Sequence, residues 1–258
     1  TAVIINGGTL NLKTGDDGVH ADGSVTIKGG DLAITQSYEG VEGEVITIDD
    51  GTFHVVSSDD GINVAGGTDT GTGGTPGGFA VCETCFLRIN KGWVVVNAAG
   101  DGLDSNGYFD MSGGTAIVNG PTGSANAALD CNGEFSISGG VLVSVHTDQM
   151  SDEIDGASPQ NILKASLTGS QTAGTLVHVE AADGTSLVTF RPTKNWKAFT
   201  FSSASFVNGN YSLYSGGSAT GNATDGLYLD GTYTPGTLVS NFTVSSTLTT
   251  VGNGSSFP

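Results

Sequence analysis

Positively charged residues are scarce in this sequence. Lys and Arg together number 8 against 26 Asp and Glu, which gives a formal net charge of -18 at pH 7 over 258 residues. Nucleic acids and anionic membrane surfaces are bound through clustered Lys and Arg, so this composition argues against both as partners. The carboxylates must either stay solvated or gather cations.

Long apolar runs are missing, and cysteines are few. No stretch of 18 apolar residues could form a transmembrane helix, and the chain starts at Thr1 without a signal-peptide pattern, so we expect a processed chain that does not insert into the membrane. The cysteines are Cys82, Cys85 and Cys131. One Cys-x-x-Cys pair without a nearby His is weak evidence for zinc, so we favour a disulfide within that loop and one free thiol, with the pairing left open.

Glycine, by contrast, is abundant, and the apolar fraction is large enough for a core. The chain has 42 Gly and 37% hydrophobic residues. Thr, Ser, Asn, Val and Ile make up much of the remainder, which is a composition of strands and turns. The length allows one large domain or two small ones.

A repeat of about 21 residues runs through the first 160 residues. The glycines at equivalent turns are Gly8, Gly30, Gly51, Gly92, Gly114 and Gly140. They are separated by 22, 21, 41, 22 and 26 residues, and the longest step holds one repeat plus a Gly-rich insertion at residues 66–85.

Apolar residues occupy fixed positions around each turn glycine. The residues three positions before it are Ile5, Ile27, Ile48, Ile89, Met111 and Ile137. The residues five positions before it are Val3, Val25, Ile46, Leu87, Phe109 and Phe135. The residues two positions after it are Leu10, Leu32, Phe53, Val94, Ala116 and Leu142. A further apolar position holds Val19, Val41, Ile62, Leu103, Leu129 and Ile154. Each repeat therefore contributes short strands with alternating burial.

These columns predict an all-β fold, a right-handed parallel β-helix (β-solenoid) in which each repeat forms one coil. A coil cannot bury its apolar face alone, whereas stacked coils share a continuous core. A β-sandwich would also have frequent turns but would not keep the columns in register. We expect regular coils over residues 1–160, and irregular coils or a β-rich C-terminal cap of the same domain over residues 161–258.

Acidic residues form two further columns along one edge of the predicted solenoid. The first acidic column consists of Asp17, Glu39, Asp60, Asp101 and Asp152, with Ala127 interrupting it. The second acidic column consists of His20, Glu42, Asn63, Asp104, Asp130 and Asp155. Two of the acids in the first column follow another acid, Asp16 and Asp59.

Stacked carboxylates predict calcium. Parallel coils place equivalent residues about 4.8 Å apart, and at an effective dielectric constant of about 20 each carboxylate pair then costs on the order of 3 kcal/mol. Ca²⁺ takes oxygen ligands and fits between such carboxylates better than Mg²⁺ does. The alternative is that the Asp-Gly pairs serve only as turn residues. His20 is interpreted as a surface residue of its coil rather than a ligand. The predicted calcium ligands are Asp16, Asp17, Glu39, Glu42, Asp59, Asp60, Asn63, Asp101, Asp104, Asp130, Asp152 and Asp155.

Three segments, residues 14–21, 37–42 and 58–63, resemble the clostridial cell-surface carbohydrate-binding β-helix family. They read TGDDGVHA, SYEGVE and SDDGIN, and the similarity is specific over residues 1–65 and looser over residues 101–104 and 225–233. The resemblance implies a pectate-lyase-like β-helix with calcium on its acidic turns that binds cellulose-like and acidic plant polysaccharides without established catalysis. The positions that match the family motif are Asp16, Asp17, Glu39, Glu42, Asp59, Asp60 and Asn63.

The expected function is therefore non-catalytic polysaccharide binding outside the cell or at its surface. Trp93, Tyr38 and Arg88 are the candidate carbohydrate-binding residues. Trp93 faces outward by strand parity, although a lone surface aromatic would look the same, and Tyr38 could instead pack beside the acidic columns.

Two other functions stay open. A calcium-dependent polysaccharide lyase needs an Arg or Lys base, and neither Arg88 nor Lys13 belongs to a recognisable constellation. A homo-oligomer or extracellular fibre could form if the C-terminal strands near residues 242–251 covered the open first coil of the next subunit.

Overall fold

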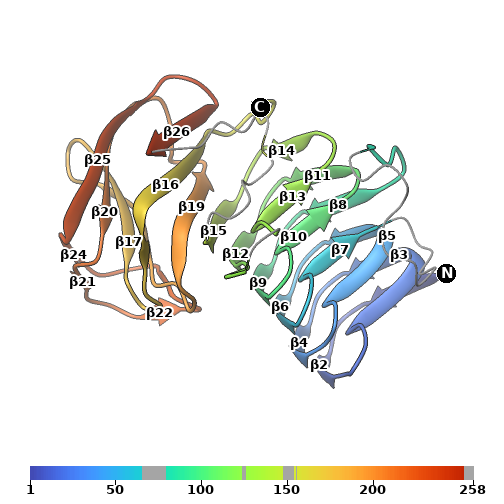
Figure 1. Cartoon of the computed structure of the whole chain (residues 1–258). Coiled ribbons are helices and arrows are strands. Elements are labelled where there is room, and N and C mark those ends of the chain that lie inside the picture. Colours follow the sequence, from blue (N-terminus) through green and yellow to red (C-terminus); the bar gives the residue numbers. More distant parts are fainter. Residues whose placement is uncertain (66–79, 124–125, 148–153, 155, 253–258) are drawn as a thin grey trace.

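The computed structural model of the chain describes residues 1–65, 80–123, 126–147, 154 and 156–252. This part of the chain folds into strands and turns and contains no helix, hence none that could cross a membrane. The predicted parallel β-solenoid is confirmed, because coils over residues 1–146 stack in parallel in two sheets (Figure 1).

Each coil alternates between the two sheets. The first sheet contains β1 (Ala2–Ile5), β3 (Val19–Ile27), β5 (Val41–Ile48), β7 (Ile62–Val64), β8 (Phe86–Ile89), β10 (Leu103–Ser105), β11 (Tyr108–Met111), β13 (Leu129–Cys131) and β14 (Phe135–Ile137). The second sheet begins with β2 (Thr9–Lys13), β4 (Asp31–Gln36), β6 (Thr52–Ser57), β9 (Trp93–Ala98), β12 (Thr115–Asn119) and β15 (Val141–His146). All pairs among these strands are parallel.

The predicted apolar columns lie in register in the core of the solenoid. Phe109 on β11 is the register partner of both Leu87 and Phe135, for example. The rings of Phe109 and Phe135 stack with their centroids 4.3 Å apart. Like residues therefore pack on like residues from one coil to the next, as expected where parallel strands lie about 4.8 Å apart.

The turn glycines adopt a backbone conformation that other residues rarely reach. Their φ angles are 93° (Gly8), 94° (Gly30), 103° (Gly51), 91° (Gly92), 77° (Gly114) and 85° (Gly140). At Gly114 a Cβ would also lie 2.7 Å from the carbonyl oxygen of Gly92 in the preceding coil. Both the left-handed φ and the close stacking of turns therefore require glycine here.

The disulfide and the free thiol favoured from the sequence are both present in the structure. Cys82 and Cys85 form a disulfide directly before β8, and Cys131 is a buried free thiol. Most of the Gly-rich insertion, residues 66–79, lies outside the described residues.

After β15 the chain changes to mostly antiparallel pairing. The second sheet continues through β19 (Trp196–Ser203), β16 (Ile162–Gln171) and β26 (Leu248–Gly252). A third sheet has the order β22 (Ala223–Thr224), β23 (Leu227–Tyr228), β18 (Ser186–Phe190), β17 (Val177–Ala181), β20 (Gly209–Ser215) and β25 (Thr237–Val244). A small sheet pairs β21 (Ser218–Ala219) with β24 (Tyr233–Thr234). The strands β25 and β26 pair with β20 and β16 of their own chain.

Two apolar clusters share the second sheet. Its inward face belongs to the solenoid core, as at Val94. Its outward face at β9, β12 and β15 contributes Val95, Ile117, Val143 and Val145 to a second cluster, whose other buried members come from the C-terminal part of the chain. These three strands are thus buried on both faces, and the antiparallel pairing of β19 to β15 ends the parallel stacking in this sheet.

Candidate cation site and polysaccharide-binding surface

The first acidic column lies at the turn before β3, β5, β7 and β10. The backbone hydrogen bonds connect consecutive coils: Gly18 N–H donates to the Glu39 carbonyl at 2.9 Å, and Gly40 N–H donates to the Asp60 carbonyl at 2.9 Å. Gly61 N–H continues the series to the Asp101 carbonyl at 2.8 Å. Members of the first acidic column, which are one repeat apart in the sequence, therefore lie next to one another in adjacent coils.

The second acidic column lies on the strands themselves. In register, His20 is opposite Glu42, and Glu42 is opposite Asn63. Asn63 is in turn opposite Asp104, and Asp104 is opposite Asp130. Asp152 and Asp155, which were predicted to extend the two columns, lie outside the described residues.

Carboxylates of the first acidic column accept hydrogen bonds from the next coil. Asp60 Oδ1 accepts from the backbone N–H of Asp101 at 2.6 Å, and Asp101 Oδ1 accepts from the N–H of Ala127. Asp17 Oδ1 accepts from the N–H of Glu39 at 3.3 Å. The Asp-Gly pairs therefore do contribute to the turns, but across coils, and these bonds use only one oxygen of each carboxylate.

Asp60, Asp101 and Asp104 form a cluster at the middle of the columns, which we call the central cluster. One carboxylate oxygen from each lies within 4.8 Å of the others. Burial, reinforced by neighbouring carboxylates, raises the pKa of Asp60 to about 6 and that of Asp101 to about 7. The pKa of Asp104 is raised well above its ordinary value, again chiefly because the group is buried. Three partly desolvated acids side by side are unfavourable without a counter-charge.

Two buried oxygens beside this cluster lack hydrogen-bond partners. Asn63 donates from Nδ2 to Glu39 Oε1 at 2.9 Å, while Glu39 Oε2 and Asn63 Oδ1 have no partner among the described residues. Asn63 is only 7% exposed. Burial raises the pKa of Glu39 to about 8, against the lowering effect of the Asn63 bond. Native proteins rarely leave buried oxygens unsatisfied, so these atoms fit the oxygen shell of a hard cation such as calcium.

Asp17, His20 and Glu42 form a second group of possible ligand atoms, nearer the N-terminal end, and we call it the N-terminal cluster. Its three ligand atoms also lie within 4.8 Å of one another. Unlike the central cluster, it contains an imidazole nitrogen, so the two clusters differ in ligand chemistry.

An outer column holds Asp16, Tyr38 and Asp59. The Tyr38 N–H donates to the Asp16 carbonyl at 3.0 Å and the Asp59 N–H to the Tyr38 carbonyl at 2.9 Å. The Tyr38 side chain is 50% exposed, and its hydrogen bond to the Asp59 carboxylate raises its pKa to about 12. This column therefore presents a ring and a carboxylate to solvent beside the buried acids.

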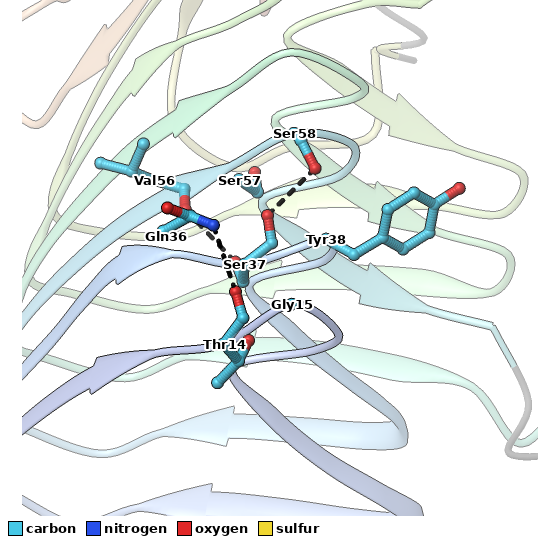
Figure 2. Close-up of a pocket in the computed structure, with 8 residues that line it drawn as sticks. All are labelled: Thr14, Gly15, Gln36, Ser37, Tyr38, Val56, Ser57 and Ser58. Atoms are coloured by element: carbon cyan, nitrogen blue, oxygen red, sulfur yellow. Dashed lines mark hydrogen bonds between the residues drawn. The ribbon is translucent and has the colours of Figure 1, made fainter.

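A hollow of about 270 Å³ opens next to Tyr38. It is lined by Thr14, Gly15, Gln36, Ser37, Tyr38, Val56, Ser57 and Ser58. Figure 2 shows the Tyr38 ring projecting to one side of the hollow, while Thr14, Gln36 and Val56 lie on the other. Hydroxyl and amide groups from three successive coils line it, which are the groups that hydrogen-bond sugar hydroxyls.

Trp93 and Arg88 occupy different faces of the molecule. Trp93 points outward from β9, as expected from parity, but it packs against the second apolar cluster and donates from Nε1 to Asp225 Oδ2 at 2.7 Å. The Arg88 guanidinium lies over the Phe86 ring, 4.2 Å from its centroid. Only Tyr38 among the three candidates adjoins the acidic columns.

The sequence interpretation missed Lys194. From the loop between β18 and β19 its Nζ donates to the carbonyl oxygens of Ala98 and Gly120, and burial lowers its pKa to about 8. No local pattern marks this residue, because its partners are 74 and 96 residues away in sequence.

A protein-family profile described as a carbohydrate-binding domain-containing protein matches residues 1–40. No curated protein and no solved structure matches the chain. The matched segment contains the first two coils, with Asp17, His20 and Glu39 of the acidic columns. This match and the β-solenoid fold fit a polysaccharide-binding role.

Proposed function

We propose that this protein binds an acidic or cellulose-like polysaccharide without cleaving it, and that calcium ions held on the acidic columns support this binding. The observation that carries the calcium assignment is the pair of buried, unpartnered oxygens of Glu39 and Asn63 beside the central cluster. The match of residues 1–40 to a carbohydrate-binding family supports the polysaccharide assignment.

The central cluster, with Glu39 and Asn63, would hold the best-enclosed ion. All of these side chains offer oxygen, the ligand that calcium prefers. When bound, calcium neutralises the carboxylates and can coordinate a uronate carboxylate or sugar hydroxyls where its shell is open. Among the other predicted ligands, Asp59 directly precedes Asp60, and Asp130 is the register partner of Asp104 on the next coil. Asp16 lies two coils before Asp59 along the outer column.

Tyr38 and the adjoining hollow form the surface that we assign to the sugar chain. The exposed ring supplies a face on which a pyranose can stack. Successive coils contribute the hydroxyl of Thr14, the amide of Gln36 and the hydroxyl of Ser58. These groups could therefore contact successive sugar units of an extended polysaccharide lying along the solenoid axis. A setting outside the cell or at its surface suits such a function, because calcium is abundant there.

The test is binding to polygalacturonate and to cellulose, with calcium and with a chelator, by co-sedimentation or affinity electrophoresis. We expect retention with calcium and about tenfold weaker binding with chelator, corresponding to about 1.4 kcal/mol. Asp104→Asn should reproduce the chelator effect, while Asp110→Asn, which changes an exposed aspartate on β11, should not. Tyr38→Ala should weaken binding with calcium still bound, whereas the exposed control Val207→Ala should not.

Two results would contradict the proposal. One is equal binding with and without calcium in all variants. The other is release of unsaturated products from polygalacturonate incubated with the protein and calcium, which would indicate a lyase.

A further inference from the structure

The N-terminal cluster brings three ligand types together from two coils. Asp17 comes from the turn before β3, His20 from β3 and Glu42 from β5. His20 Nδ1 lies 3.5 Å from Asp17 Oδ2 and 3.5 Å from Glu42 Oε2. The other oxygen of Asp17 is engaged by the Glu39 backbone, which fixes the orientation of this carboxylate.

These separations suit a shared ion better than direct hydrogen bonds. Ordinary N–H···O bonds measure about 2.7 to 3.2 Å, and both contacts of His20 Nδ1 are longer, at 3.5 Å. Ligands about 2.1 Å from a tetrahedral zinc ion lie about 3.4 Å from one another. The two contacts of His20 Nδ1 thus match the spacing of ligands in such a shell, and all three ligand atoms lie within 4.8 Å of one another.

A further carboxylate stands behind the imidazole. Asp22 Oδ1 lies 3.9 Å from His20 Nε2, the ring nitrogen that does not face the cluster. Asp22 is itself held in place, because its Oδ2 accepts a hydrogen bond from Thr1 Oγ1 at 2.9 Å. Metal-binding histidines commonly direct their second ring nitrogen toward a carboxylate, which orients the ring and makes the ligating nitrogen more basic. At 3.9 Å the Asp22 carboxylate is beyond direct hydrogen-bond distance, so it acts on the imidazole through its charge. Asp22 itself belongs to neither acidic column.

We propose that Asp17, His20 and Glu42 form a second cation site, selective for a divalent transition metal of the zinc class, with Asp22 orienting His20. This assignment replaces the calcium expected at Asp17 and Glu42 from the sequence, and it makes His20 a ligand rather than only a surface residue. Calcium takes oxygen ligands almost exclusively, whereas zinc and its neighbours bind imidazole well. The central cluster offers only oxygen, so the two sites differ in metal class. The side chain of His20 is 31% exposed, which leaves room for a solvent or sugar oxygen to complete the shell. The inference does not depend on polysaccharide binding.

The test uses the whole chain after removal of metals with a chelator and dialysis. Isothermal titration with Zn²⁺ should show one site per chain, and Co²⁺ should give the visible absorption of a site with a nitrogen ligand. His20→Gln should weaken zinc binding at least about tenfold, and Asp22→Asn about tenfold, the usual effect of losing an orienting partner. His54→Gln is the matched control: the His54 ring on β6 contacts Asp225 rather than the N-terminal cluster, so this substitution should leave zinc binding unchanged.

Each possible outcome supports or overturns the site. Zinc affinity that is unchanged in His20→Gln, or no zinc binding by a protein that melts normally, overturns it. Equal loss of calcium and zinc in His20→Gln overturns the assigned metal class. Asp104→Asn, expected to weaken calcium binding and leave zinc binding intact, separates failure here from failure of the calcium-dependent function. Metal-free His20→Gln should melt as the wild type does, because the His20 side chain is partly exposed and its contacts with Asp17 and Glu42 are long, at 3.5 Å.

Discussion

The Trp93 indole and the Asp225 carboxylate are joined by a hydrogen bond of 2.7 Å, although the two residues are 132 positions apart. The other oxygen of Asp225 pairs with His54 Nε2 at 3.0 Å. Asp225 adopts a φ of 49°, a conformation that aspartate tolerates better than most residues. One carboxylate thus links β6 and β9 of the solenoid to the loop before β23.

Trp93→Phe should destabilise the protein by about 1 to 3 kcal/mol, because it removes a hydrogen bond to a charged, partly buried acceptor. Urea denaturation would measure the change. Asp225→Asn should also lower the free energy of unfolding. Asparagine tolerates the positive φ at this position as aspartate does, so the substitution tests the carboxylate and not the backbone. Unchanged stability in Trp93→Phe, with weaker polysaccharide binding, would instead indicate that the indole acts on the sugar.

Calcium should raise the melting temperature. Binding at one hundred times the dissociation constant stabilises the native state by about 2.7 kcal/mol, which for a chain of this size corresponds to roughly 5 to 10 °C. Scanning calorimetry with calcium, magnesium and chelator would measure it, and magnesium should give the smaller effect. Asp104→Asn should lose most of the calcium-dependent increase. A chelated protein that melts at the calcium-loaded temperature would contradict the prediction.

The metal-free protein should become less stable as the pH rises. Asp60, Asp101 and Glu39 have native pKa values of about 6, 7 and 8, all above their ordinary values, so the native state binds more protons than the unfolded state between about pH 4 and pH 8. The contribution of these three groups to the free energy of unfolding is therefore greatest near pH 4. It decreases as the pH rises, and the decrease ends above about pH 8, where all three groups are ionised in the native state as well. Denaturation in chelator at pH 5, 6, 7 and 8 tests this.

Calcium should reverse that pH dependence, because protons compete with the ion for the same oxygens. The stabilisation by calcium should thus be small at pH 5 and largest at pH 8. A calcium effect that is equal at both pH values would show that the ions bind elsewhere.

Gly114→Ala should destabilise the solenoid by roughly 1 to 3 kcal/mol, because alanine is strained at a φ of 77° and its Cβ would approach the Gly92 carbonyl at 2.7 Å. Gly123→Ala is the matched control, since nothing lies within 4 Å of a Cβ there. Thermal denaturation of both variants in calcium gives the comparison. Equal stability of the two would mean that the coils relax around the added methyl group.

The register of the coils could be predicted because the sequence repeats with a short period of about 21 residues. Each turn glycine fixes the positions of the apolar residues around it, so alignment by glycine already pairs Leu87 with Phe109 as the structure does. The acidic columns follow from the same register, which is why their vertical neighbours were predictable. The sequence did not predict which of the carboxylate and amide oxygens are buried, because their burial depends on how the turns of adjacent coils pack.

The sequence by itself determined the parallel solenoid, the core columns and the edge on which the acids gather, since a periodic chain repeats the same local interactions in every coil. Only the tertiary structure decided that β19 ends the parallel stack, that Val95 is buried by a second cluster, and that Lys194 and Asp225 contact the coils. Those contacts join segments with no common period, so they depend on the shapes of two surfaces that form only once each part of the chain has folded.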